Sequence, residues 1–272
     1  MSSAVTTEQT AAGLDTQQMA KFVMDGYIEF DDLVPADLNA TAHDEQLRAP
    51  QETYWEPKNP NAFLDISSAT QAVLELPRYR AVLTSLLGPD YVHDHSYLHI
   101  TPAGKRDSQR WHVDHDRAGR RLTRDFFRFN ILIAYFTHDV PREMGPTLVL
   151  PGSHLRDVGG HELSRYRNIT GQKHLAGSGG RIVFLHDAMW HCAQPNLTDE
   201  PRYMFKVRYH PSAPQREQFD TEGWDSSEIW RLFRDNVDRH PWQGSSSDQA
   251  AAVRDAWWRY LCGADEPANG VS

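Results

Sequence analysis

Apolar residues follow a helical period near both ends of the chain. Met19, Phe22 and Val23 lie three or four residues apart, as on one face of a helix. Asp15-Thr16 can cap this helix and Gly26 can end it. Helices are predicted over 15–26, 35–48, 69–87, 226–237 and 248–262, with a short strand at 27–30 and a polar loop at 49–62.

The middle of the chain, from Tyr91 to His210, has a different pattern. Short β-prone runs alternate with turns rich in Gly and Pro. Strands are predicted at 93–101, 111–115, 126–136, 147–150, 181–185, 190–194 and 203–209. Many short strands at this spacing are typical of a sandwich or barrel. We therefore expect one domain over 15–272, preceded by a loose tail at 1–14 and ending in a helical extension at 220–263.

The composition predicts a folded protein with a large core. The 272 residues include eight Trp, eleven Phe and ten Tyr, and a chain of this length buries roughly 70–75% of its unfolded surface. Trp257 and Trp258 are accordingly predicted to pack in the core or under a lid. The longest apolar run, 131–136, is too short to span a membrane.

Charge and cysteine content narrow the function classes. The net charge of −9 argues against general binding to nucleic acid or anionic membranes. Two cysteines do not make a disulfide scaffold. No basic segment followed by an apolar one opens the sequence, so no secretory signal is expected. We expect a cytoplasmic monomer or homodimer that acts on a small molecule.

The segment Trp111-His112-Val113-Asp114 carries the first candidate chemistry. If 111–115 is a strand, His112 and Asp114 project from the same face. An imidazole and a carboxylate placed so can form two corners of a metal site. The alternative is a hydrogen-bonded pair on the surface of a strand.

A third ligand is predicted at His191, because of the residues that follow it. Pro195 to Pro201 form a turn signal, after which Arg202 begins a strand that we expect to return past His191 as a hairpin. A buried Arg needs an anion, and its planar guanidinium suits a carboxylate. His186 is an alternative ligand, but it lacks this spacing to Arg202.

Two His and one carboxylate form the facial triad of non-haem Fe(II) oxygenases. With His112, Asp114 and His191 as that triad, Arg202 would hold an acidic co-substrate. This combination predicts a metal-dependent oxygenase.

Four segments resemble the phytanoyl-CoA dioxygenase-like (PhyH) family of Fe(II)/2-oxoglutarate oxygenases. They are MAKFVMDGYIEFDDLV, WHVD, REMGPTLVLPGSH and GGRIVFLHDAMWHCAQPNLTDEPR, and they occur in the family's order. The similarity runs from about residue 15 to 210, with Met144 where the family usually has Asn. The resemblance implies a mainly β protein with flanking helices, a double-stranded β-helix (jelly-roll, cupin-like) braced by helices on one sheet.

Carried over to this sequence, the resemblance implies Fe(II) ligands at His112, Asp114 and His191 and a 2-oxoglutarate anchor at Arg202, with O2 as the oxidant.

The resemblance also implies contacts between 2-oxoglutarate and the strand YLHITP. By alternation, its inward residues are Tyr97 and His99; ordinary barrel packing is the alternative for both. Relatives often have a small hydroxyl residue where this chain has Ala193, so that hydrogen bond must come from elsewhere, such as His99 or Thr147.

The implied reaction is oxidation of a small organic substrate, coupled to conversion of 2-oxoglutarate to succinate. Hydroxylation is the default, and desaturation, cyclisation or epimerisation are possible. The aromatic content favours tailoring of a natural product in secondary metabolism. The Arg-rich loop 117–128 allows an acyl-CoA hydroxylase as an alternative. Outside this class, a cupin-type metalloenzyme without 2-oxoglutarate and a non-catalytic ligand-binding jelly-roll remain open.

Overall fold

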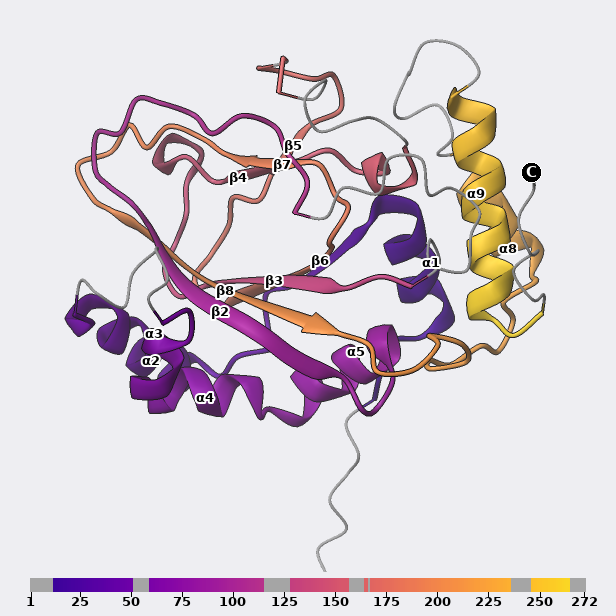
Figure 1. Cartoon of the computed structure of the whole chain (residues 1–272), viewed down its shortest axis with the longest axis horizontal. Helices are drawn as coiled ribbons and strands as arrows, with labels where there is room; N and C mark the ends of the chain where they lie inside the picture. Colours follow the sequence, from indigo (N-terminus) through magenta and orange to yellow (C-terminus); the bar gives the residue numbers. More distant parts are fainter. Residues whose placement is uncertain are drawn as a thin grey trace, which may run out of the picture.

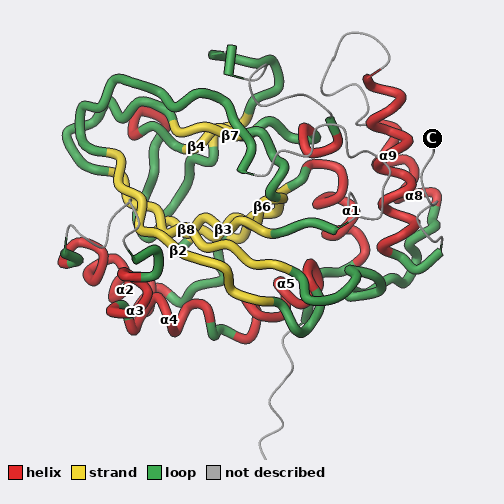
Figure 2. The backbone as a smooth tube through the Cα atoms, in the orientation of Figure 1, coloured by secondary structure: helices red, strands yellow, loops and turns green. Residues whose placement is uncertain are grey.

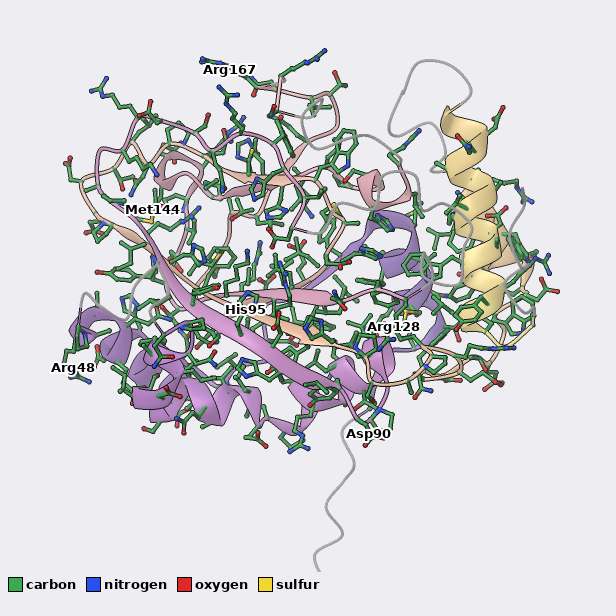
Figure 3. All side chains as sticks on the ribbon, viewed as in Figure 1. Arg48, Asp90, His95, Arg128, Met144 and Arg167 are labelled. Carbon is green, nitrogen blue, oxygen red and sulfur yellow. The ribbon has the colours of Figure 1, made fainter. Side chains whose placement is uncertain are left out.

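Two antiparallel sheets face each other, and helices cover the outer face of the larger one (Figure 1). The computed structural model describes residues 12–50, 59–114, 128–156, 164–165, 167–235 and 246–264. Within these ranges, strands and helices alternate with long loops (Figure 2). Side chains fill the space between the sheets (Figure 3). The predicted fold class, a double-stranded β-helix with flanking helices, is confirmed.

The larger sheet has the strand order β1-β6-β3-β8-β2. Its strands are β1 (Tyr27–Phe30), β2 (Val92–Thr101), β3 (Ile131–Phe136), β6 (Arg181–His186) and β8 (Arg202–His210). Each side chain along a strand points to the face opposite its neighbours. On β8, Phe205 and Val207 therefore pack towards the helices, whereas Met204 packs towards the smaller sheet.

The smaller sheet has the order β5-β4-β7 and lies on the other side of the barrel. Its strands are β4 (Thr147–Val149), β5 (Lys173–His174) and β7 (His191–Ala193). Leu148 and Cys192 pack outward in a small cluster with Trp111 and Trp190. Residues on either side of Cys192 consequently point into the barrel.

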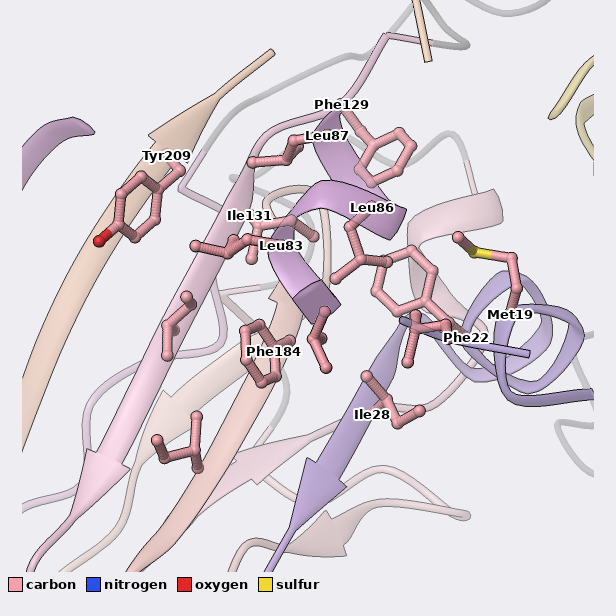
Figure 4. Close-up of a cluster of buried hydrophobic side chains, with 14 of the residues drawn as sticks. Met19, Phe22, Ile28, Leu83, Leu86, Leu87, Phe129, Ile131, Phe184 and Tyr209 are labelled. Atoms are coloured by element: carbon pink, nitrogen blue, oxygen red, sulfur yellow. The ribbon is translucent and has the colours of Figure 1, made fainter. Parts of the chain in front are cut away.

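The main core lies between the larger sheet and its helices (Figure 4). The helices that cover this sheet are α2 (Ala36–Arg48), α3 (Ala62–Ile66), α4 (Ser68–Leu74) and α5 (Pro77–Leu87). Leu83 and Leu86 of α5 share this core with Ile131 and Phe184 of the sheet. This packing holds the sheet in place and so supports the side chains on its other face, which point into the barrel.

Helix α1 (Thr16–Asp25) begins and ends as its sequence predicts. Asp15 accepts a hydrogen bond from the backbone of Gln18, whose side chain bonds back in a capping box. Gly26 closes the helix with a left-handed φ of 79°. A Cβ at residue 26 would lie 2.3 Å from Nδ1 of His154, so the site also needs Gly for space.

Helices α8 (Ser227–Asp235) and α9 (Ser246–Leu261) pack at one end of the barrel, next to α1 (Figure 1). Trp257 of α9 contacts the rings of Phe22, Phe129 and His186. Trp257 and Trp258 are both almost fully buried, which confirms their predicted core role. The division of the chain into a tail at 1–14 and one domain stays a prediction.

Several predicted elements differ from the structure. The helix predicted at 69–87 is two helices, because Pro77 begins a new one at its N1 position. Residues 62–66, at the edge of the predicted loop, form α3. Residues 111–114 form no continuous strand, and His112 makes a single bridge pair. The two-residue β5 carries too short a pattern to be predicted.

Two 3-10 turns, η2 (Arg142–Met144) and η3 (Ser153–Leu155), flank β4. None of the helices in the described ranges has the length and apolar character needed to cross a bilayer.

Candidate metal centre

His112 and His191 lie opposite each other across an antiparallel bridge. The backbone N–H of each donates to the carbonyl of the other, at 3.1 and 3.0 Å. The ring centroids are 4.3 Å apart. The two histidines, distant in sequence, therefore form one pair inside the barrel, where His191 is buried.

Both imidazoles have the same tautomer, although their planes are tilted by 53°. Nδ1 of His112 lies 2.9 Å from the carbonyl oxygen of Arg110, and Nδ1 of His191 lies 2.9 Å from that of Met189. A carbonyl oxygen only accepts, so each Nδ1 carries the proton. Each Nε2 then presents a lone pair, which is how a neutral histidine binds a metal.

Asp114 supplies an oxygen to the same point. Its Oδ1 lies 3.8 Å from Nε2 of His112 and 3.6 Å from Nε2 of His191. Donor atoms of all three residues lie within 4.8 Å of one another. Burial lowers the pKa of His191 to about 4, so this imidazole stays neutral at pH 7. The arrangement offers two nitrogens and one anionic oxygen to a single cation.

The side of Asp114 turned away from the histidines contacts two cations. Its Oδ2 lies 2.8 Å from Nζ of Lys206 and 2.8 Å from Nη2 of Arg208. Burial raises the pKa of Asp114, but attraction to His191 in its protonated form and to the cations Lys206 and Arg208 outweighs this effect and holds the pKa well below its usual range. The sequence analysis missed both cations, although alternation along β8 from Arg202 places them on the same face.

Arg202 lines the same cavity as His112 and His191. This cavity has a volume of about 190 Å³. Arg202 is 2% exposed and its Nη1 donates to the carbonyl of Gly145, whereas its buried Nε has no hydrogen-bond partner among the residues described. Burial lowers its pKa to about 10, so it stays charged at pH 7. Among the described residues, no carboxylate forms an ion pair with Arg202.

The remaining lining is polar at one end and apolar along the walls. Hydroxyl groups come from Thr101 and Thr147, and an imidazole comes from His99. Five apolar side chains also line it, Leu132, Ala134, Leu175, Leu185 and Met204, together with the polar residues Lys105, Asp107, Ser108 and Gln109. Such a cavity suits a small molecule with a charged end and a short aliphatic body.

Other candidate residues lie at different distances from the cavity. His99 lines the cavity. Burial lowers its pKa to about 3, and the positive charges of Lys206 and Arg202 add to this effect. Tyr97 pairs with Lys206 across β2 and β8 and packs against His95 and His99, outside the lining set. Ala193 lines the cavity with Thr147 opposite in register.

His186 is not part of this centre. It accepts a hydrogen bond from the backbone of Ala188 and stacks on Phe129, 5.1 Å between centroids. Alternation along β6 turns its side chain towards the helices, whereas Leu185 faces the cavity. The alternative ligand therefore lies on the wrong face of the sheet.

The predicted hairpin between His191 and Arg202 is wrong. β7 pairs with β4 in the smaller sheet, and β8 pairs with β2 and β3 in the larger one. The connecting residues cross from one sheet to the other. Arg202 thus reaches the cavity from the sheet opposite His191. Of the Arg-rich loop 117–128, only Arg128 lies in the described residues, and it donates to the carbonyl of Pro211.

Comparisons with known proteins agree with this geometry. The sequence profile of the phytanoyl-CoA dioxygenase (PhyH) family matches residues 22–204. No curated protein sequence matches the chain. Among solved structures, EctD from S. alaskensis with 2-oxoglutarate and 5-hydroxyectoine has a TM-score of 0.59 at 22% identity, over 78% of this chain and 81% of that chain.

Two further structures share the fold. The epimerase SnoN in complex with Fe3+, alpha ketoglutarate and nogalamycin RO has a TM-score of 0.55 at 22% identity, over 72% of this chain and 83% of that chain. The non-heme monooxygenase ThoJ, as a Ni complex, has a TM-score of 0.54 at 20% identity, over 72% and 80% of the two chains. At these identities the likeness establishes the fold.

Proposed function

Because the chain belongs to the phytanoyl-CoA dioxygenase (PhyH) family, we propose that it is an Fe(II)/2-oxoglutarate-dependent oxygenase acting on a small organic substrate. One observation carries the proposal. Two imidazole Nε2 atoms and one carboxylate oxygen converge beside a cavity that also holds a buried guanidinium, which has no acidic partner among the residues that the structure describes. These are the parts needed to hold a metal and a dicarboxylic acid side by side.

The donor set fits Fe(II). His112, Asp114 and His191 would hold the metal through Nε2, Oδ1 and Nε2, the set typical of non-haem Fe(II) oxygenases. The carbonyls of Arg110 and Met189 fix both rings, and outer contacts of this kind orient metal ligands.

The cavity fits 2-oxoglutarate. A buried guanidinium without a counter-ion is costly, and a carboxylate at Arg202 removes that cost and satisfies the orphaned Nε. Thr101 and Thr147 offer hydroxyls, and the apolar wall suits two methylene groups. We propose His99 as a further contact and Tyr97 as a support for His99.

When bound, iron and 2-oxoglutarate would supply activation of O2 and release of succinate. The chain's own residues would bind, orient and shield these groups. Asp114 would bring a negative charge, and Arg202 would fix the far carboxylate and with it the co-substrate's position. The apolar side chains of Leu132, Leu185 and Met204 would shield the centre from water.

We propose a natural product as substrate, with hydroxylation as the default outcome. The structural neighbours named above include an epimerase bound to nogalamycin RO and an enzyme bound to 5-hydroxyectoine. Both ligands are small organic molecules, which supports this substrate class. A cytoplasmic location and a monomeric or homodimeric state complete the proposal.

Spectroscopy under anaerobic conditions provides the test. Fe(II) and 2-oxoglutarate added together should give a weak visible charge-transfer band, which a cupin-type enzyme without 2-oxoglutarate or a ligand-binding jelly-roll would not give. A screen for succinate release across metabolite classes then identifies the substrate. Absence of the band in the wild-type protein, with Fe(II) bound, would contradict the proposed co-substrate.

A further inference from the structure

We propose that Lys206 and Arg208 are positioning residues that set the orientation of Asp114 towards the metal. The inference rests on the proposed function and adds two residues to it. Neither cation is placed to replace a metal ligand. Each acts through the one carboxylate that both contact.

The geometry around Asp114 divides its two oxygens between different partners. Oδ1 faces the two imidazoles, at 3.6 and 3.8 Å from their Nε2 atoms. Oδ2 lies 2.8 Å from Lys206 and 2.8 Å from Arg208. With Oδ2 held twice, the carboxylate cannot rotate without breaking a charged hydrogen bond with Lys206 and an ion pair with Arg208. A metal would therefore meet one oxygen of Asp114 and not two.

The strand register explains how two cations reach one oxygen. Lys206 and Arg208 are two residues apart on β8, so both point into the barrel. The neighbouring β3 places Ala134 opposite Lys206 and Leu132 opposite Arg208. The small side chain of Ala134 leaves space for the lysine stem. Their side chains are only 15% and 16% exposed, so solvent screens these ion pairs weakly.

The backbone at Asp114 does not hold the side chain in this way. His112 is fixed by its bridge to His191, but Asp114 lies two residues further on, outside any strand. The contacts from β8 are thus the ones that tie the carboxylate to the rigid sheet. Hydrogen bonds and ion pairs that orient a metal ligand are important for metal binding in many proteins. Their loss typically costs about 10- to 100-fold in metal affinity or activity.

Lys206 and Arg208 also have an opposing effect, because two positive charges near the site repel a divalent cation. Removing either cation would weaken this repulsion and tighten metal binding if charge alone mattered. Orientation of Asp114 predicts the opposite change. The sign of the change in metal affinity therefore separates the two effects.

The experiment measures Co(II) affinity by titration of the metal-free, full-length protein, together with the melting temperature of the metal-free form. Lys206→Met and Arg208→Met each remove a cation and keep an unbranched side chain of similar length. We expect each to raise the Kd for Co(II) by about 10-fold, and the double variant by up to about 100-fold. Lys206→Arg and Arg208→Lys should stay within about threefold of the wild type, because they retain the charge and the contact with Oδ2.

Arg181→Met is the matched control. Arg181 is also on a strand of the larger sheet, its side chain is 15% exposed, and it pairs with Asp31 at 2.5 Å. Its loss should lower the melting temperature without changing the Kd for Co(II). An unchanged or tighter Kd in Lys206→Met and Arg208→Met would overturn the positioning role. If the double variant fails to fold, the single variants carry the same test.

Failure of the two proposals can be distinguished. A wild-type protein that binds no Co(II) at one equivalent would contradict the proposed function, and this inference with it. A wild-type protein that binds Co(II), with Met variants that bind it equally well, would contradict this inference alone.

Discussion

The backbones of His112 and His191 hydrogen-bond to each other twice, and their rings lie 4.3 Å apart. The bridge fixes the Cα positions of both residues, and the carbonyls of Arg110 and Met189 fix their rings. Two of the three proposed metal ligands are thus oriented by backbone groups. The third, Asp114, is oriented by side chains, which makes it the most adjustable member of the set.

Removal of the Asp114 carboxylate should abolish turnover. Asp114→Ala takes away the anionic donor and leaves two imidazoles beside Lys206 and Arg208, whose charges then repel the metal. We expect succinate formation to fall by more than about 100-fold. Succinate release with Fe(II), 2-oxoglutarate and substrate measures this. Asp31→Ala is the control, because Asp31 is the surface partner of Arg181. Full turnover by Asp114→Ala would show that Asp114 is not a metal ligand.

Local patterns predicted the elements better than their pairing. The caps of α1 and the short β-prone runs of β2, β3, β6 and β8 depend on neighbouring residues, so they are readable from the sequence. The supposed hairpin between His191 and Arg202 failed because strand pairing is non-local: the turn after β7 leads to the other sheet. His112 and Asp114 were paired correctly, but through an assumed strand that is only a bridge.

Lys206 and Arg208, which the sequence analysis missed, show the same difference between local patterns and non-local contacts. Arg202 was found from its spacing to His191, and the same alternation continues to Lys206 and Arg208. Their contact with Asp114 could not be predicted, because it requires β8 to lie beside the segment that follows His112. That placement depends on how the two sheets close around the cavity.

Loss of the Arg202 guanidinium should impair 2-oxoglutarate binding more than the chemical step. Within the described part of the chain, its buried Nε has no hydrogen-bond partner, and its Nη1 donates to the neutral carbonyl of Gly145. Arg202→Ala should raise the KM for 2-oxoglutarate by about 10- to 100-fold, the usual value of a charged hydrogen bond, with a smaller change in kcat. Arg202→Lys should lie between the two. Initial rates against 2-oxoglutarate concentration give both constants, and an unchanged KM would place the anchor elsewhere.

Stability of the metal-free protein should fall in mild acid, in part through His99. Burial lowers the pKa of His99 to about 3, whereas an unfolded histidine titrates near 6.5. Below about pH 6.5 the unfolded chain binds a proton that the native His99 does not, so stability is lost as the pH falls from about 6.5 towards 3. At pH 5 the loss is roughly 2 kcal/mol.

His99→Gln removes the loss of stability that is caused by protonation of His99 in the unfolded chain. The melting temperature should therefore fall less between pH 7 and pH 5 than it does in the wild type. His95→Gln provides a comparison on the same strand, at a residue that lies outside the cavity lining. Equal slopes for the wild type and His99→Gln would show that His99 is not buried as a neutral group.

Gly145 links backbone conformation to the co-substrate anchor. It has a φ of 69°, and a Cβ there would lie 2.3 Å from the carbonyl oxygen of Pro195. Its own carbonyl accepts the hydrogen bond from Arg202. Gly145→Ala must therefore move this turn, which displaces the acceptor that orients the guanidinium. We expect a several-fold rise in the KM for 2-oxoglutarate as well as a lower melting temperature.

Gly223→Ala separates these two effects. Gly223 has a φ of 72°, and a Cβ there would meet nothing within 4 Å. It shares the cost of a left-handed conformation, about 1–2 kcal/mol, without a clash and without a contact to Arg202. Its melting temperature should fall while the KM for 2-oxoglutarate stays the same. If both alanine variants change the KM equally, the effect of Gly145 is general destabilisation. If only Gly145→Ala changes it, the turn before β4 holds Arg202 in place for its ligand.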